Sequence, residues 1–306
     1  MMISFIIPTY RNDKSLLKCV REIIEIGISL KLKYEIIVVD NFFTNEYIDK
    51  LSIIEYSHLT IIKNPVLGAH HSRRLGLYNS EGDIIIFVDD DNYLTAEYIS
   101  FIILNSQSKT NKNFFIGCAT KEFLKVEWEK NEYSPLTYAC GSLEGANFKK
   151  NIPVYWGAGM AMNRELGFKI FQKELIVEGR MAKKKYIMSG EDHEYSLRAY
   201  FYKADFFYYS DIGLYHDFNL ERLSVEYYKK VQIGFVYAAY ILKIYYDLQG
   251  SKKIYTNIYL WYLSNLMFVI GYNLKHPFKL ESSLLFIDAI NFIKLKNRFV
   301  LVNSIL

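Results

Sequence analysis

Short apolar runs alternate with longer stretches of helical spacing along the first part of the chain. Runs rich in β-branched and aromatic residues predict strands at residues 4–7, 35–39, 60–63, 84–88 and 114–119. Apolar side chains at helical spacing predict helices at residues 14–30, 69–78 and 92–104. Strands and helices in alternation indicate a mostly parallel, Rossmann-like sheet with helices on both of its faces.

The pattern weakens after this first part and then changes its character. Between residues 120 and 155, Gly, Pro, Asn and charged positions predict loops and short strands around a site. A helix over 191–202 and a strand over 206–209 are expected next. We therefore divide the chain into an α/β domain, residues 1–216, and a C-terminal helical extension, residues 217–306.

The composition is that of a folded globular protein. The chain has 306 residues, of which 51% are hydrophobic and 23% are charged, so that wholesale disorder is excluded. The net charge of +4 is too weak to indicate a nucleic-acid partner. Three scattered cysteines without a CxxC pair argue against a disulfide scaffold and against a zinc site.

The C-terminal extension carries the basic surplus of the chain. It holds 11 Lys plus Arg against 6 Asp plus Glu, a net of +5, together with 18 aromatic residues. Two interpretations stay open: the extension contacts anionic lipid or a partner subunit as a homodimer, or it caps the sheet with a solvated basic face.

Membrane and targeting signals are weak. Residues 254–274 approach the length of a span, but they include Thr and several Asn, and they predict a buried or interfacial helix. The N-terminus lacks a basic region, and Pro8 interrupts its apolar stretch, so that we expect a first strand there and no signal peptide. The α/β domain is expected in the cytoplasm, either in solution or at the inner face of the membrane.

Two apolar runs end in carboxylates. Residues 36–39 lead into Asp40, and residues 84–88 lead into three consecutive aspartates, of which Asp89 is the first. In an open parallel sheet, ligands bind beyond the carboxyl ends of the strands, where these acids would meet. Three adjacent carboxylates repel one another, and an oxygen-preferring divalent cation such as Mg²⁺ or Mn²⁺ would relieve that repulsion. A solvated acidic turn is the alternative.

The usual phosphate-binding loops are missing. The chain has no GxGxxG after its first strand and no GxxxxGK[ST] at any position. A carboxylate-bound metal is another way to neutralise a diphosphate, which favours a nucleotide-diphosphate compound over NAD. Glu191 and Asp192 follow Gly190 in the first turn of a predicted helix, where the helix dipole favours acids.

Six segments taken together resemble the inverting family 2 glycosyltransferases with a GT-A fold. They are SFIIPTYRN, EIIVVDN, GAHHSRRLGL, GDIIIFVDDDN, VYWGAGMAMNRE and GEDHEYSLR, which occur in the order of that family. The resemblance covers roughly residues 3–217. It implies a hexosyltransferase that moves a sugar from a nucleotide-diphosphate sugar to an acceptor hydroxyl, with inversion at the anomeric carbon.

The resemblance also implies roles for individual residues. Asp192, after Glu191, would be the general base, and His216 would be a third metal ligand unless it is an ordinary surface histidine. The DxD motif that would hold Mn²⁺ or Mg²⁺ comprises Asp89, Asp90 and Asp91, and which two of them bind the metal stays open. The residues implied to line the donor are Pro8, Thr9, Tyr10, Asp40, Arg73, Asp90, Trp156, Gly157 and Gly159.

The sequence departs from the family in two places, and Trp156 allows two roles. Asn41-Phe42-Phe43-Thr44 stands where Gly, Ser and Thr are usual, so that the base pocket is expected to be bulkier. Arg73-Arg74 replaces the usual Arg-Asn pair. Trp156 would stack on a sugar or pack in the core.

The partners follow from the same resemblance. A UDP-sugar is the favoured donor, and the expected acceptor is a glycan or a lipid-linked saccharide in bacterial surface polysaccharide or glycan synthesis. Two other functions stay open. A metal-dependent nucleotidyltransferase would need a Gly-rich basic first loop, which this chain lacks. A non-catalytic nucleotide-sugar-binding protein would not need the acids that are present here.

Overall fold

An eight-stranded mixed sheet forms the centre of the molecule. The computed structural model describes residues 1–10, 13–42, 57–107, 112–128, 133–148, 152–177, 187, 189–250, 258–275, 285, 291–303 and 305. The strands of the sheet are β1 (Ile3–Thr9), β2 (Tyr34–Asp40), β3 (Leu59–Lys63), β4 (Ile84–Phe87), β5 (Asn92–Leu94), β6 (Phe114–Glu122), β9 (Ala161–Asn163) and β10 (Asp205–His216). The two short strands β7 (Asn147–Phe148) and β8 (Ile152–Pro153) pair separately.

The strand order is β3-β2-β1-β4-β9-β6-β10-β5. The pairs β3-β2, β2-β1, β1-β4 and β6-β10 are parallel. The other three pairs are antiparallel, because β9 lies between β4 and β6 and because β5 runs against the end of β10. The expected α/β fold with a mostly parallel sheet is confirmed, with β9 as an antiparallel insertion.

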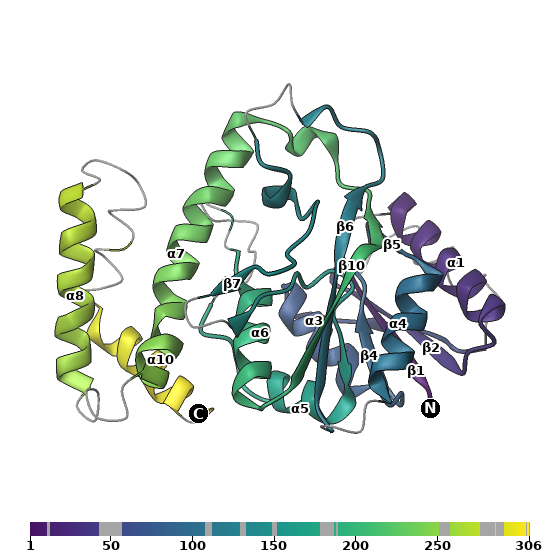
Figure 1. Cartoon of the computed structure of the whole chain (residues 1–306), viewed down its shortest axis with the longest axis horizontal. Coiled ribbons are helices and arrows are strands. Elements are labelled where there is room, and N and C mark those ends of the chain that lie inside the picture. Colours follow the sequence, from purple (N-terminus) through teal and green to yellow (C-terminus); the bar gives the residue numbers. More distant parts are fainter. Residues whose placement is uncertain are drawn as a thin grey trace.

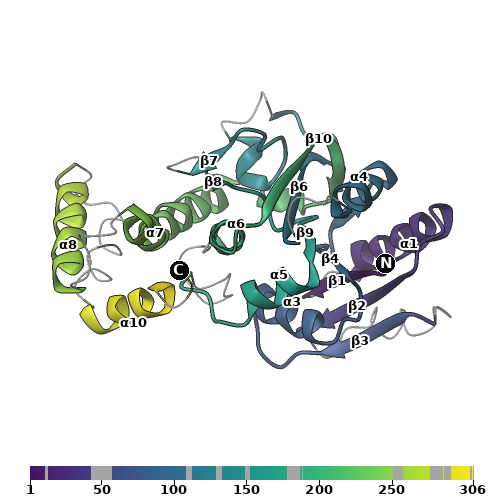
Figure 2. The ribbon, with the colours of Figure 1, turned by 60° about the horizontal axis from the view of Figure 1, so that its bottom comes forward.

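Helices cover both faces of the sheet (Figures 1 and 2). One face carries α1 (Asp13–Ser29) and α4 (Ala96–Ser106), and the other carries α3 (Ala69–Tyr78), α5 (Arg164–Phe171) and α6 (Glu191–Phe201). Side chains alternate along β1: Phe5 and Ile7 join the core under α1 and α4, whereas Ile6 joins the core under α3, α5 and α6. A strand covered on both faces reads as a continuous apolar run, as the sequence does here.

The helix expected over residues 92–104 begins later than predicted. Tyr93 and Leu94 are buried in β5, where they pair with Tyr215 and Leu214 of β10. The helix α4 starts after Thr95, whose side chain accepts a hydrogen bond from the backbone of Tyr98 and caps the helix. A three-residue strand that is specified by a partner far along the chain leaves no local period to detect.

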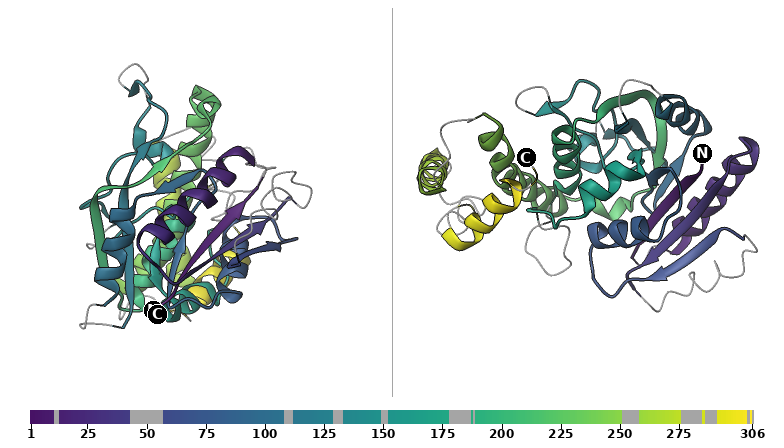
Figure 3. Two further views of the ribbon diagram at one scale, coloured as in Figure 1. Left: turned by 90° about the vertical axis from the view of Figure 1, so that its right-hand side faces the viewer. Right: turned by 90° about the horizontal axis from the view of Figure 1, so that it is seen from below.

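In the part of the chain that the structure describes, three α-helices follow the last strand of the sheet. They are α7 (Val225–Gly250), α8 (Ile258–Lys275) and α10 (Phe292–Asn303). The helix α7 lies beside α6, while α8 and α10 lie farther from the sheet, at one end of the molecule (Figures 1 and 3). None of the helices that the structure describes is long and apolar enough to cross a membrane.

A buried ion pair within α6 (Glu191–Phe201) is hydrogen-bonded to α7. Glu194 and Arg198 of α6 form a salt bridge of 2.8 Å with no solvent exposure on either side chain. Tyr245 of α7 donates a hydrogen bond of 2.9 Å to Glu194, which also accepts from the backbone N–H groups of Ile176 and Val177. Because a buried charge needs all these partners, α7 is tied to the helix that begins with Glu191.

Candidate active site

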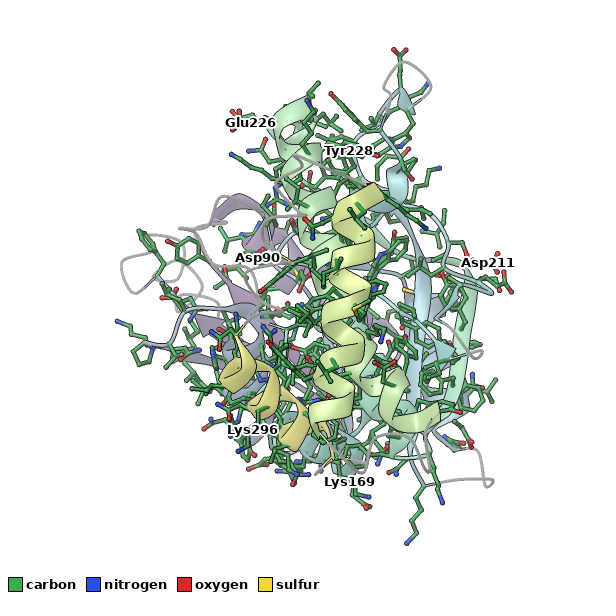
Figure 4. The ribbon with its side chains drawn as sticks, turned by 90° about the vertical axis from the view of Figure 1, so that its left-hand side faces the viewer. Asp90, Lys169, Asp211, Glu226, Tyr228 and Lys296 are labelled. Carbon is green, nitrogen blue, oxygen red and sulfur yellow. The ribbon has the colours of Figure 1, made fainter. Side chains whose placement is uncertain are left out.

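The implied site residues converge where the parallel strands end. Thr9 at the end of β1 is paired in register with Asp40 at the end of β2. The three aspartates follow β4, which is the other neighbour of β1. Asp90 lies beside the purple N-terminal strands in Figure 4. The topology therefore gathers at one edge of the sheet the acids that the sequence placed after two apolar runs.

Asp90 and Asp40 organise the first two strand ends. Thr9 Oγ1 donates a hydrogen bond of 2.6 Å to Asp90 Oδ2. Asp40 is fully buried and accepts a hydrogen bond of 2.7 Å from the backbone of Phe42. The Phe42 ring lies edge-on to the ring of Tyr10, with the two centroids 5.6 Å apart. The aromatic pair lies where a bulkier base pocket was expected; Phe43 and Thr44 lie outside the described residues.

Arg73 of α3 joins two acids that are far apart in sequence. Its Nη2 donates to Asp89 Oδ1 at 2.7 Å, and its Nη1 donates to Glu191 Oε1 at 3.0 Å. Burial disfavours the charged guanidinium, but the carboxylates of Asp89 and Glu191 outweigh burial and raise the pKa of Arg73. We call the two hydrogen bonds from Arg73 to Asp89 and Glu191 the Arg73 fork. A Cβ on Gly157 would lie 3.2 Å from Nη2, so the glycine leaves room for this fork.

Asp91 faces His216 because of the antiparallel β5–β10 pair. That pairing sets His216 opposite Asn92, and His216 Nε2 lies 3.5 Å from Asp91 Oδ2. The other ring nitrogen, Nδ1, lies 2.9 Å from the carbonyl oxygen of Tyr138, which can only accept. Burial opposes protonation of His216, but Asp91 outweighs it and raises the pKa of His216 to about 10.

Asp91 and His216 are the described residues that would hold a divalent cation. Asp91 Oδ2 and His216 Nε2 are 3.5 Å apart, and the imidazole would have to give up its Nε2 proton to bind a metal, because only a neutral imidazole is a ligand. Carboxylate oxygen and imidazole nitrogen both suit Mn²⁺. Among the described residues, no three His, Cys, Asp or Glu side chains gather into a metal site, and Asp89 is turned toward Arg73. Substrate and water would supply further ligands.

Asp192 lies at the first turn of α6, directly after Glu191. The turn begins at Gly190, whose φ of 111° is readily adopted only by glycine. The carboxylate of Asp192 accepts a hydrogen bond of 3.0 Å from the backbone N–H of His193, and it lies at the helix end that favours negative charge. Of the two acids, Glu191 is therefore paired with a guanidinium, whereas Asp192 is bound by a neutral N–H.

The segment with Trp156 packs closely against the sheet. Gly159 has φ of 71°, and a Cβ there would lie 2.8 Å from Leu214. The backbone N–H of Gly159 donates to Phe87 at the end of β4. Trp156 is half-buried and packs against the core under α1 and α4. Of its two expected roles, the structure therefore shows core packing for the buried part of the side chain.

Several polar residues beside the site were not singled out from the sequence. Ser72 of α3 donates to Asn41 at 2.8 Å and accepts from Asn64 at 3.2 Å, which ties the ends of β2 and β3 to the helix of Arg73. His70 Nδ1 lies 3.0 Å from the hydroxyl of Tyr195 on α6. Burial lowers the pKa of His70 to about 2, so the ring is neutral. For His70 and Ser72, the signal in the sequence is a cluster of polar residues within a half-apolar helix.

Comparison with known proteins agrees with this architecture. The model of the family described as Glycosyl transferase family 2 matches residues 4–170. The solved structure of TarS residues 1–349 from S. aureus is 17% identical, with a TM-score of 0.53 over 100% of this chain and 83% of that one. TarS has also been solved with UDP-GlcNAc, at 16% identity and a TM-score of 0.53 over 96% of this chain and 81% of that one.

A second glycosyltransferase has a similar fold. The mannosyltransferase PcManGT from Pyrobaculum calidifontis, solved with GDP-Man and Mn²⁺, is 12% identical, with a TM-score of 0.54 over 97% of this chain and 86% of that one. No curated protein matches the chain. These structural likenesses support the fold, and the family match covers more than half of the chain. The family resemblance is thus confirmed over residues 4–170, which contain the first five of the six motifs: the chain belongs to glycosyl transferase family 2, a family of glycosyltransferase enzymes.

Proposed function

We propose that the chain transfers a sugar from a nucleotide-diphosphate sugar, preferably a UDP-sugar, to an acceptor hydroxyl with inversion at the anomeric carbon. The observation that carries this proposal is the Arg73 fork, which joins Asp89 of the DxD motif to Glu191, the neighbour of the expected base. The fold relatives TarS and PcManGT were solved with UDP-GlcNAc and with GDP-Man plus Mn²⁺, which supports a nucleotide-sugar donor.

The donor would lie across the ends of β1, β2 and β4. We assign the base pocket to Asp40 with the Tyr10–Phe42 pair, and we assign the metal ligands to Asp91 and His216. Asp89 is left out of the metal set because Arg73 already holds it. When bound, Mn²⁺ or Mg²⁺ would neutralise the diphosphate oxygens and the charge that develops on the leaving group.

Asp192 would act as the general base. Its carboxylate would take the proton of the acceptor hydroxyl while that oxygen bonds to the anomeric carbon and the bond to the nucleoside diphosphate breaks. Attack from the face opposite the leaving group inverts the anomeric centre. Glu191 is less suited to accept a proton, because the Arg73 guanidinium stabilises its charged form.

The acceptor is proposed more broadly. We infer a glycan or a lipid-linked saccharide of bacterial surface polysaccharide or glycan synthesis, on the basis of the basic, aromatic extension. Membership of a glycosyltransferase family counts against the nucleotidyltransferase and non-catalytic alternatives.

A panel of nucleotide sugars tested by thermal shift, with and without Mn²⁺, examines the donor site. A ligand that binds only the folded chain must raise its unfolding temperature, by an amount that corresponds to about 2.7 kcal/mol at a hundredfold excess over Kd. We expect one donor class to give a Mn²⁺-dependent shift that Asp91→Asn removes and that Asp211→Asn, at a distant exposed position, retains. A folded chain that no donor shifts under any condition would refute the assignment.

A further inference from the structure

The outer face of α8 is a stripe of large apolar side chains. Leu263, Met267, Ile270 and Leu274 follow one another at intervals of four, three and four residues, so that they lie on one side of the helix. Between 36% and 79% of each side chain is exposed. At 1.5 Å per residue the stripe is about 16 Å long.

The opposite side of α8 packs on the protein. Val269 is fully buried in the core that α7 contributes to, and Leu266 packs against that core. The ring of Phe268 stacks on Tyr240 of α7, with the centroids 6.3 Å apart, although 44% of Phe268 is exposed. Both sides of α8 thus carry large apolar side chains, and in the part of the chain that the structure describes it is the side with Leu266 and Val269 that packs on the core. A helix that is apolar all round is typical of a protein core or of a membrane environment.

The helix α10 adds to the same end of the molecule. It contacts α8 and shares its core through Leu295 and Val302. Ile293 and Val300 lie seven residues apart on its outer side and are 73% and 57% exposed, with Lys296 between them. Figure 4, which views this end directly, shows both helices in front of the rest of the molecule and Lys296 on α10.

The charge on these two helices has one sign. The sequences of α8 and α10 contain no Asp and no Glu, whereas they contain Lys275, Lys294, Lys296 and Arg298. Lys275 is exposed at the end of the stripe, next to Leu274. Among the described residues of these two helices, Lys275 and Lys296 are the exposed charges, whereas Lys294 is half-buried and Arg298 is buried.

We propose that the end formed by α8 and α10 docks on a bilayer surface that contains anionic lipid. Apolar side chains would enter the boundary between headgroups and acyl chains, and the lysines would meet anionic headgroups. A second copy of the chain suits this surface less well, because a symmetric contact would bring basic residues together without an acid from either helix to pair with them. This inference does not depend on the catalytic proposal, since it concerns a surface outside the site.

Vesicle flotation tests the proposal with the full chain. We expect binding to phosphatidylcholine vesicles that contain phosphatidylglycerol, and weaker binding to phosphatidylcholine alone or at high salt. Met267→Ser combined with Leu274→Ser should weaken binding about a hundredfold, because each embedded side chain contributes about tenfold. Lys275→Gln combined with Lys296→Gln should weaken it by a smaller factor, about fivefold for each lysine near the surface.

The matched control removes two equally exposed apolar side chains elsewhere. Ile28→Ser combined with Leu104→Ser, at 68% and 72% exposure on α1 and α4, should leave vesicle binding unchanged. Failure of the wild-type chain to bind anionic vesicles would overturn the proposal. Equal vesicle binding by the Met267/Leu274 variant and by the Ile28/Leu104 control would also overturn it. So would a dimer in sedimentation velocity that the Met267/Leu274 variant dissociates, because a second copy would then cover the stripe. Unchanged unfolding temperatures establish that each variant is folded.

Discussion

At the scale of single residues, the site is organised by charged groups that hold one another. Each aspartate of the motif has its own partner: Asp89 faces Arg73, Asp90 faces Thr9, and Asp91 faces His216. The repulsion between adjacent carboxylates is therefore relieved in three directions. The third pair places a carboxylate oxygen and an imidazole nitrogen 3.5 Å apart, and these are the two atoms that we assign to the metal.

Arg73 and Arg74 are adjacent in the sequence, but we expect the loss of Arg73 to lower stability and donor binding much more than the loss of Arg74. The substitution Arg73→Met would leave two carboxylates without their buried cation and should cost about 3 kcal/mol of stability, toward the lower end for broken buried pairs because Asp89 is partly exposed. Donor-induced stabilisation should also be lost. The substitution Arg74→Met removes a surface pair with Glu174 and a contact of the guanidinium with the Tyr78 ring, each of which contributes about 0–1 kcal/mol. Urea unfolding of both variants, with and without donor, measures the contrast; equal effects would contradict the role of the fork.

His70 should make stability depend on pH. Its pKa is about 2 in the folded chain and near 6.5 when exposed, so the unfolded chain binds a proton that the folded chain excludes. The contribution of neutral His70 to the free energy of unfolding is therefore fully present above pH 6.5. It is lost as the pH falls below 6.5, by about 1.4 kcal/mol per pH unit.

The substitution His70→Phe removes that titration. It keeps a ring beside Phe171 and gives up the hydrogen bond to Tyr195, so at neutral pH it should destabilise the chain by about 1 kcal/mol. Chemical unfolding at pH 7.5 and pH 5 should find the variant closer to the wild type, or more stable than it, at the lower pH. Parallel losses of stability in the two chains would contradict this.

At the scale of elements, the position of α6 decides where the expected base lies. The helix starts at Gly190, and a Cβ there would lie 2.8 Å from Ala238 of α7. The same helix presents Glu191 and Asp192 to the site and buries Glu194 against α7. Site and extension are thus connected through one helix.

Gly190→Ala should displace the first turn of α6. The backbone conformation is strained for alanine, and the new methyl group meets Ala238, so we expect a loss of about 1–3 kcal/mol of stability and a lower turnover. Gly271→Ala is the matched control, because a Cβ on this helical glycine has nothing within 4 Å and should be neutral or slightly stabilising. Calorimetric unfolding and donor turnover of both variants measure this contrast. A Gly190→Ala variant with the same unfolding temperature and turnover as the Gly271→Ala control would contradict the role of Gly190.

The element pattern was largely readable from the sequence, because apolar strands covered on both faces and amphipathic helices have local periods. Residues 69–78 form the expected helix, and the strand expected over 206–209 extends over Asp205–His216. What could not be read depends on distant partners. Arg73 and Glu191 are 118 positions apart, and Glu194 with Arg198 resembles an ordinary surface pair at i,i+4 although both are fully buried.

At the scale of the whole molecule, the extension is part of the structure of the site. The division at residue 217 follows the end of β10, but Leu197 of α6 and Ile152 of β8 share one core with α7. We expect residues 1–216 alone to aggregate, because Glu194 and Arg198 would lose their cover. Residues 1–250 should stay folded and retain donor-induced stabilisation, although vesicle binding should be lost. Soluble yield and thermal shift of the two fragments test this, and a stable 1–216 fragment would contradict it.

The reaction proposed for this site depends on Asp192, which would take the proton of the acceptor hydroxyl. The most direct test compares Asp192→Asn with the wild type in two measurements: donor affinity by titration calorimetry and the rate at which nucleoside diphosphate is released. We predict an affinity within about threefold and a release rate lower by about 10²–10⁴-fold. An unchanged rate, or an affinity that falls as steeply as the rate, would contradict the account.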